Sequence, residues 1–204
     1  MSASPYPVRL VGGDDLGRSR LTVFFRLFLL IPHVVVVFLY GILAYIVTVV
    51  AWFAALFTGR VPDGLHGLIA DYTRYSLRVT AYGAIMADPF PPFGGGGEYP
   101  VDVQIDPPAP QGRLGVFFRL LLALPCLLVA NLLQNLLWLI AIGCWFVALF
   151  TGGVPEGLQT LGNFCLRFTV RTNAYLMLVN PRYPAFGDTP GTLPGDQGTL
   201  PPIP

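Results

Sequence analysis

Two long stretches of the chain, residues 27–59 and 120–155, contain no Asp, Glu, Lys or Arg. A helix needs about 18 or more apolar residues without charge to cross the hydrocarbon core of a bilayer, and each stretch is longer than that. Only 11% of all residues are charged and 54% are hydrophobic, whereas about a quarter of the residues in an ordinary soluble domain are charged. We therefore expect two membrane-embedded regions rather than the core helices of a soluble protein.

The second half of the chain repeats the first at an offset of 93 positions. In both halves Val-Phe-Phe-Arg-Leu opens the apolar stretch, at 23–27 and 116–120, and Ala-Leu-Phe-Thr-Gly closes it, at 55–59 and 148–152. Further identical pairs involve residue types that a general apolar bias would not align, namely Pro32 and Pro125, Trp52 and Trp145, Arg74 and Arg167, Arg78 and Arg171, and Tyr82 and Tyr175. The pattern indicates a duplication and predicts two copies of one structural unit.

The duplication also predicts the division of the chain. The first repeat unit covers residues 1–98 and the second covers residues 99–191, with the glycine run at 94–97 as a flexible joint. Residues 192–204 are rich in Gly, Pro and Thr. Because such a composition cannot bury a core, we expect a disordered tail there.

The order of motifs resembles a known family. Phe-Phe-Arg is followed by Ile-Pro-His, by Ala-Trp-Phe-Ala-x-Leu-Phe-Thr-Gly and then by an Arg-bearing helix, as in an uncharacterised bacterial membrane-protein family, the domain-of-unknown-function family 4389. Both units match, although the second has Leu124-Pro125-Cys126 where the first has Ile31-Pro32-His33. The resemblance implies two tandem copies and a membrane location, and it implies no activity.

Each apolar stretch can enter a membrane in two ways. As one helix, 33 residues would be about 50 Å long, whereas the hydrocarbon core is about 30 Å thick. A transmembrane helical hairpin over 22–39 and 42–57 would turn at Tyr40-Gly41. In the second unit it would turn near Asn131, Gln134 and Asn135, and it would leave all twelve Arg on one side of the membrane. The alternative is a single kinked span, with the helix broken at Pro32.

Behind each apolar stretch lies Thr-Gly-x-Val-Pro and then a segment with helical periodicity. Apolar residues recur there at steps of three and four, and Arg occupies the polar positions, which is typical of an amphipathic helix in the membrane interface. Short alternating segments at 6–11 and 99–105 predict a β-strand at the start of each repeat. Because the two strands are equivalent, we expect them to pair antiparallel, with Arg9 near Asp102. The fold class predicted is thus an all-α integral membrane protein of two tandem repeats with a short strand pair.

Six arginines are candidate contacts for lipid headgroups or for a partner. Arg26 and Arg119 lie one turn inside the apolar helices, where a long side chain can also reach back to the interface. The other four form two i, i+4 pairs, one in each unit: Arg74 with Arg78, and Arg167 with Arg171. Together the six are predicted to form a cationic rim that attracts anionic lipid, the alternative being a solvated helix face with Asp71 as a local ion-pair partner.

Residues typical of catalysis or metal binding form no recognisable constellation. His33 and His66 have Cys126 and Gln159 as their counterparts, which argues against a duplicated metal site. The three cysteines, Cys126, Cys144 and Cys165, are read as small buried hydrophobic residues. We expect no enzyme activity, no cofactor and no metal. With 12 basic and 11 acidic residues, no nucleic-acid partner is expected either.

The expected function is that of a small structural or accessory membrane protein that binds a membrane-protein partner or organises anionic lipid. An oligomeric channel or small-solute transporter is the alternative. Membrane lipid, a membrane-protein partner or a homo-oligomer are the expected partners. The expected location is the inner membrane, multi-pass, with the soluble parts mainly in the cytoplasm.

Overall fold

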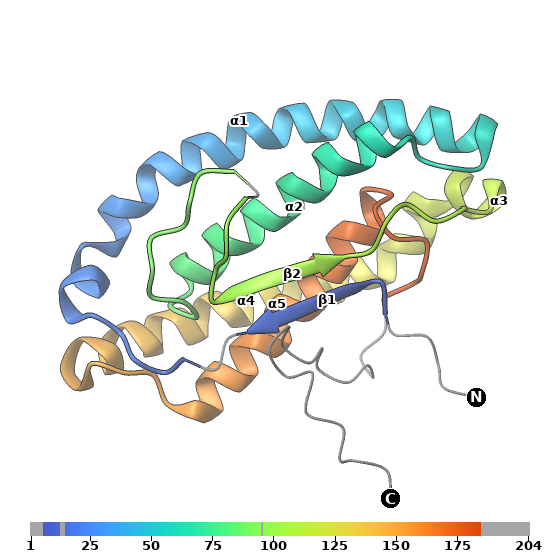
Figure 1. Ribbon diagram of the computed structural model, residues 1–204. Helices are drawn as coiled ribbons and strands as arrows, with labels where there is room; N and C mark the ends of the chain where they lie inside the picture. The colour runs from blue at the N-terminus through green and yellow to red at the C-terminus, as the bar shows by residue number, and fades with distance from the viewer. Residues whose placement is uncertain (1–5, 13–14, 95, 185–204) are drawn as a thin grey trace, which may run out of the picture.

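The computed structural model describes residues 6–12, 15–94 and 96–184. The predicted tail at 192–204 lies outside these residues. The described chain is mostly helical, and its elements repeat in order (Figure 1). They are β1 (Val8–Gly12), α1 (Arg20–Thr58) and α2 (Asp63–Gly83), followed by β2 (Val101–Ile105), α3 (Arg113–Phe117), α4 (Arg119–Thr151) and α5 (Glu156–Leu176).

Each long apolar stretch forms one uninterrupted helix. The 39 residues of α1 correspond to a rod about 58 Å long, and the helix continues through Pro32. Both long helices end at a left-handed glycine, Gly59 and Gly152, each at φ 77°. The amide N–H of each glycine donates to the carbonyl of the residue four positions earlier, a geometry that glycine adopts without steric cost.

The predicted hairpin within each apolar stretch is therefore wrong, and so is the predicted break at Pro32. Gly41 is needed for close packing rather than for a turn, because a Cβ atom there would lie 3.0 Å from the Tyr72 hydroxyl oxygen. In the second unit the Asn135 side-chain amide donates to Asn131 Oδ1, one turn earlier on the same helix. These polar residues thus satisfy one another along α4 without ending it.

The two strands pair antiparallel, as predicted. The register joins Val8 to Ile105, Leu10 to Val103 and Gly12 to Val101. Since Val101, Val103 and Ile105 are the counterparts of Val8, Leu10 and Gly12, the pairing places a pseudo-two-fold axis through the central Leu10–Val103 pair, perpendicular to the ribbon. The predicted proximity of Arg9 and Asp102 is wrong in detail, because Arg9 lies opposite Gln104 and forms its ion pair with Asp106.

The same axis relates two equivalent hydrogen bonds between the units. The indole N–H of Trp52 donates to the carbonyl of Val116, and that of Trp145 donates to the carbonyl of Val23. These contacts join the end of α1 to α3, the short helix directly before α4, and the end of α4 to the beginning of α1. The long helices α1 and α4 therefore run antiparallel and meet near both of their ends (Figure 1).

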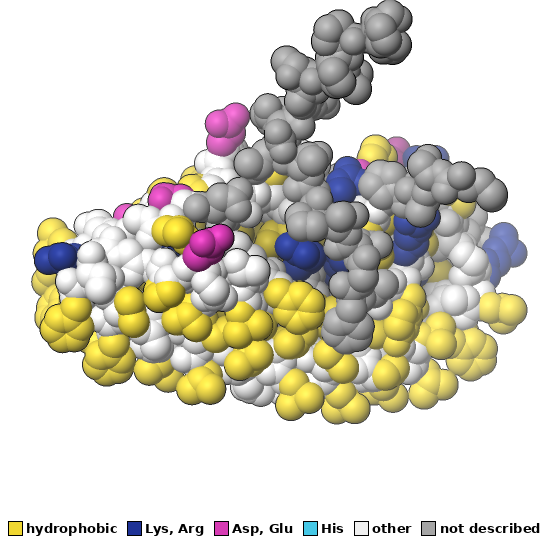
Figure 2. Space-filling view, turned by 90° about the horizontal axis from the view of Figure 1, so that it is seen from below, with side chains coloured by type: hydrophobic (Ala, Val, Ile, Leu, Met, Phe, Trp, Pro, Cys, Tyr) yellow, Lys and Arg dark blue, Asp and Glu magenta, His cyan; other side chains and the backbone are white. Residues whose placement is uncertain are grey.

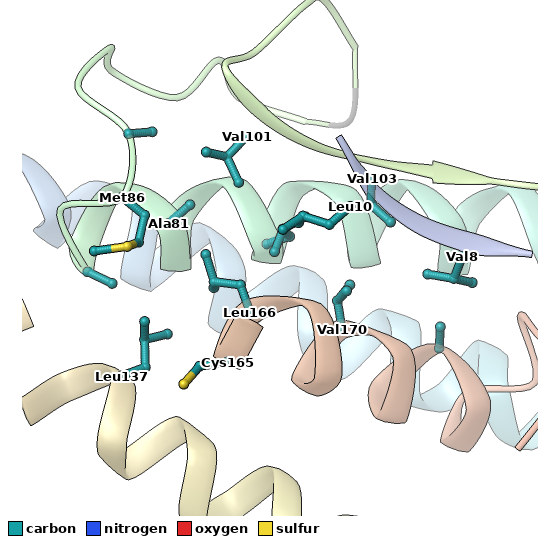
Figure 3. Packing of buried hydrophobic residues seen from close by; sticks show 14 of the residues in the cluster. Val8, Leu10, Ala81, Met86, Val101, Val103, Leu137, Cys165, Leu166 and Val170 are labelled. Carbon is teal, nitrogen blue, oxygen red and sulfur yellow. The ribbon is translucent and has the colours of Figure 1, made fainter. Parts of the chain in front are cut away.

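The core lies between the ribbon and the long helices. The inward side chains of the ribbon, Val8 and Leu10 from β1 and Val101 and Val103 from β2, point toward α2 and α5 (Figure 3). Helix α2 packs on α1, and α5 packs on α4. The molecule is thus layered, with the ribbon on the outside, α2 and α5 in the middle, and α1 and α4 on the far side.

Candidate functional site

The long helices use only a narrow stripe of their surface to contact the rest of the protein. In α1 the buried residues are Val23, Arg26, His33, Gly41, Ala44, Ala51 and Ala55. Large apolar side chains cover the exposed remainder along the whole helix, from Leu21 to Phe57. Helix α4 repeats the arrangement, from Leu120 to Phe150. We call this continuous exposed surface of α1 and α4 the apolar face; it is far larger than the patches usual on a soluble monomer.

Charged side chains gather on the opposite side of the molecule. Figure 2 shows hydrophobic side chains along one long edge and charged side chains toward the other half. Around the ribbon, Arg9 pairs with Asp106 at 2.9 Å, with 22% and 42% of the two side chains exposed. Nearby Arg74 pairs with Asp71, whose side chain is 53% exposed. The molecule therefore has an apolar side and a charged side.

Arg26 and Arg119, two of the predicted headgroup contacts, are buried at equivalent positions. Arg26 donates to the carbonyls of Tyr82 and Ala87 and pairs with Asp88 at 2.9 Å. Arg119 donates to the carbonyls of Tyr175 and Asn180 and to the side-chain oxygen of Gln111. Each guanidinium also lies over a tyrosine ring, at 4.4 and 4.5 Å from the centroid. Both residues tie a long helix to the loop after the neighbouring helix.

Arg78 and Arg171 are likewise buried and hold the ribbon to the helices beneath it. The Arg78 guanidinium pairs with Asp102 of β2 at 2.7 Å and donates to the carbonyls of Gly96 and Gly97. In the second unit Arg171 donates from Nε to the carbonyl of Val8. Its guanidinium lies 4.4 Å from the centroid of the Tyr6 ring.

The remaining two predicted contacts, Arg74 and Arg167, are half-buried. The ion pair of Arg74 with Asp71 is the local pairing that the sequence left open. Because four of the six arginines are buried in contacts within the chain, the six do not form the predicted cationic rim. Sequence reasoning overlooked Arg20 and Arg113, an equivalent pair exposed at the starts of α1 and α3. Their signal was available, since they are identical residues at the offset of 93 positions.

A buried polar residue lies beside the end of each long helix, Gln111 at the end of α1 and Arg18 at the end of α4. Arg18, beside the start of α1, donates to the carbonyls of Ile85 and Met86 and to the side chain of Gln159, and burial lowers the pKa of its guanidinium. In the equivalent place Gln111 donates to the carbonyl of Leu178. Ile85 and Leu178 both have positive φ, 64° and 65°, so the same strained turn occurs in both units.

A cavity of about 230 Å³ lies on the pseudo-two-fold axis, between α1 and α4 and against α2 and α5. We call it the central trough and define it by its polar lining: Thr73, Ser76 and Thr80 of α2, Gln134 of α4, and Thr169 and Asn173 of α5. None of the described residues that line it is Asp, Glu, Lys or Arg. Tyr45 and Asn173 are exposed at its edge. The central trough is thus an uncharged polar site enclosed by the two helices of the apolar face.

An apolar groove continues from the central trough along α1. We call this groove, which has a volume of about 500 Å³, the tail groove. Its own lining residues include Leu30, Val34, Phe38, Ile42, Val79 and Trp138. It shares four further residues with the central trough, namely Val37, Tyr45, Tyr72 and Thr80. Two smaller apolar cavities, of about 360 and 320 Å³, lie beside Arg26 and Arg119. Seven of the eight residues that line the second cavity are counterparts of residues that line the first, Phe53 being the exception, so this pair of cavities follows the duplication.

By length and composition, two of the described helices, α1 and α4, could cross a membrane. Only 17% and 22% of their most apolar 18-residue windows are buried, whereas the core helix of a soluble protein is mostly buried. Cys126, Cys144 and Cys165 are free and buried, as predicted. Among the described residues no group of three or more His, Cys, Asp or Glu side chains is placed to hold a metal ion.

Comparisons with known proteins identify the family without an activity. No curated protein and no solved structure matches the chain. A family described as a domain of unknown function, DUF4389, matches twice, at residues 20–94 and 113–187. Each match lies within one of the two predicted repeat units, and together they span well over half of the chain. The chain therefore belongs to the DUF4389 family and carries two tandem copies of its domain.

Proposed function

We propose that this protein is a structural or accessory membrane protein that lies flat in one leaflet, with the apolar face in the hydrocarbon and the ribbon in water. The observation that carries the proposal is the apolar face, which runs unbroken along both long helices while the charged groups gather on the opposite side. An amphipathic surface of this kind buries its apolar side at the boundary between headgroups and acyl chains.

The pseudo-two-fold axis favours a flat position over an upright one. If α1 and α4 stood upright, the axis would lie in the plane of the membrane, and the centre of the ribbon would be at mid-depth. The Arg9–Asp106 and Arg74–Asp71 pairs, with their exposed carboxylates, would then face hydrocarbon. A charged side chain at that depth costs about 2.5–3.5 kcal/mol or more. With the axis along the membrane normal, the same pairs remain in water.

The length of α1 supports the same position. A rod of about 58 Å exceeds the whole bilayer, which is about 40–45 Å thick with its headgroups. Its exposed apolar residues extend from Leu21 to Phe57, so an upright helix would hold apolar side chains in water. In a flat position Arg20 and Arg113, exposed at the helix starts, lie at headgroup level, where each contributes about 1 kcal/mol on an anionic surface. Organisation of lipid in one leaflet is the function that this geometry supports best.

Depth measurements test the proposal. Spin labels on single cysteines replacing Phe24, Phe38 and Phe53, all exposed on α1, should report equal depths in liposomes, from the ratio of their accessibilities to oxygen and to a water-soluble nickel complex. A label replacing Gln104 on the ribbon is the control and should report water. A deep label at Phe38 with Phe24 and Phe53 at opposite surfaces would restore the spanning arrangement. Labels that all report water would rule out membrane embedding.

A further inference from the structure

The hydrogen-bonding groups of the central trough are only partly used within the protein. The hydroxyls of Ser76 and Thr80 donate to carbonyls of their own helix, of Thr73 and Ser76 respectively. Their oxygens therefore keep lone pairs for an incoming donor. In the described part of the chain the buried Thr169 hydroxyl has no partner. Gln134, whose amide can both donate and accept, faces the same cavity.

This chemistry selects the kind of ligand. A phosphate group offers acceptors and negative charge, and it binds where Arg, Lys or a cluster of N–H donors is present. Hydroxyl and amide side chains without a cation suit instead a ligand that donates and accepts hydrogen bonds and carries no charge. The cavity opens within the apolar face and joins the tail groove. The ligand therefore has an uncharged, hydroxyl-bearing head and a hydrocarbon tail.

We propose that the central trough binds the head of an uncharged lipid with a free hydroxyl, of the diacylglycerol type, and that the tail groove holds one of its acyl chains. The proposal rests on the proposed function, since such a ligand reaches the site from the leaflet in which the apolar face lies. Joined as one site, the two cavities, about 230 and 500 Å³, are within the size usual for small-molecule sites.

Two glycines explain why the tail groove lies in the first unit. Gly41 and Gly83 flank it, and their counterparts are Gln134 and Leu176. A Cβ atom on Gly83 would lie 3.3 Å from a methyl carbon of Leu30 and 3.4 Å from the Trp138 ring, and both of these residues line the groove. A larger side chain at Gly83 would therefore obstruct the groove where it passes between these residues.

Lipid retention in native mass spectrometry tests the proposal. The full chain, in an amine-oxide detergent whose head has no hydroxyl, is mixed with equal amounts of diacylglycerol, phosphatidylglycerol and phosphatidylcholine that carry the same acyl chains. We expect diacylglycerol to be retained in preference to the other two. The double substitution Thr80→Val with Gln134→Leu should lower its retention about tenfold, since each lost hydrogen bond weakens binding severalfold.

Matched variants distinguish a loss of binding at the central trough from a general effect of substitution on lipid retention. Asn135→Leu makes the same chemical change beside Gln134, but outside the central trough, and should retain diacylglycerol like the unchanged protein. Gly83→Leu introduces the residue of the second unit and should lower retention through the tail groove. Equal retention of the three lipids, preference for phosphatidylglycerol, or no effect of the double substitution would overturn the proposal. In such a case, labels on α1 at equal depth would still uphold the flat position, whereas labels in water would refute the proposed function itself.

Discussion

His66 and Gln159 are equivalent residues that make equivalent hydrogen bonds with different chemistry. The His66 Nε2 atom lies 3.1 Å from the carbonyl oxygen of Val179, and Gln159 donates to the carbonyl of Met86, the counterpart of Val179. His66 is 6% exposed. Burial lowers the pKa of its imidazole, while the hydrogen bond to Val179 and the charge of Asp63 oppose that shift. Gln159 therefore indicates that glutamine, which does not titrate, can replace His66 in this hydrogen bond.

The substitution His66→Gln should make the protein less sensitive to mild acid. A histidine whose pKa is lower in the folded state than in the unfolded state stabilises the fold above the unfolded pKa, about 6.5, and this contribution is lost as the pH falls toward the folded value. We therefore expect the melting temperature of the unchanged protein to fall between pH 7 and pH 5 more steeply than that of the variant. At pH 7 the two should differ in stability by less than about 1 kcal/mol, because Gln makes the same bond.

Thermal unfolding followed by circular dichroism in detergent measures this difference. His33 is present in both proteins, so its own titration cancels in the comparison. Parallel melting curves across this pH range would show that His66 does not carry the acid sensitivity.

At the scale of elements, the ribbon joins the two copies of the domain. Its register decides which side chains face each other, and ion pairs follow from that register: Arg9 contacts Asp106, and Asp102 contacts Arg78 of α2. A two-stranded ribbon is marginal on its own in water. Here Arg78 and Arg171 and the inward Val and Leu side chains attach it to α2 and α5.

Cysteine pairs should report this register directly. Cysteines replacing Arg9 and Gln104, which lie directly opposite each other, are within the Cα separation that a disulfide accepts and should oxidise within one chain. The pair replacing Arg9 and Asp102 loses the same Arg9 ion pair but is offset by two residues, so it should remain mostly reduced. Non-reducing electrophoresis after mild oxidation distinguishes them, and faster oxidation of the offset pair would contradict the register.

At the scale of the whole molecule, the two units complete each other rather than folding side by side. The Trp52 indole bonds to the second unit, and the Trp145 indole bonds to the first. The amide N–H of Gln111 donates to the carbonyl of Gly59, and that of Arg18 to the carbonyl of Gly152. Each unit separately would expose an unpaired strand edge and the free surface of its helices, which is a condition that favours aggregation.

Fragments of residues 1–93 and 94–204, produced together, should therefore assemble and copurify through a tag on one of them. Fragment 1–93 produced alone should aggregate or form dimers through its own β1. Leu10→Pro in the first fragment should reduce copurification, because proline is not accommodated inside a paired strand. If the tagged fragment were monomeric and well folded without its partner, the units would be independent.

Much of this architecture follows from the sequence itself. The offset of 93 positions predicted two like units, and the equivalence of two short alternating segments predicted that they pair antiparallel about a two-fold axis. The charge-free stretches required apolar helices, because composition and length are local properties. The free, buried cysteines were predicted in the same way, and the Arg74–Asp71 pair was one of the two alternatives that the sequence left open.

Only the tertiary structure decided how these elements are used. Gly41 marks a close contact with Tyr72 instead of a turn, since a glycine in an apolar run suits either purpose until its neighbour is known. Four arginines are buried and connect separate elements, instead of lying on the surface as cations: Arg26, Arg78, Arg119 and Arg171. The sequence did not predict this, because their carbonyl and tyrosine partners lie far away in the chain. The central trough is formed where four helices meet, and only their packing brings together the hydroxyl and amide groups that line it.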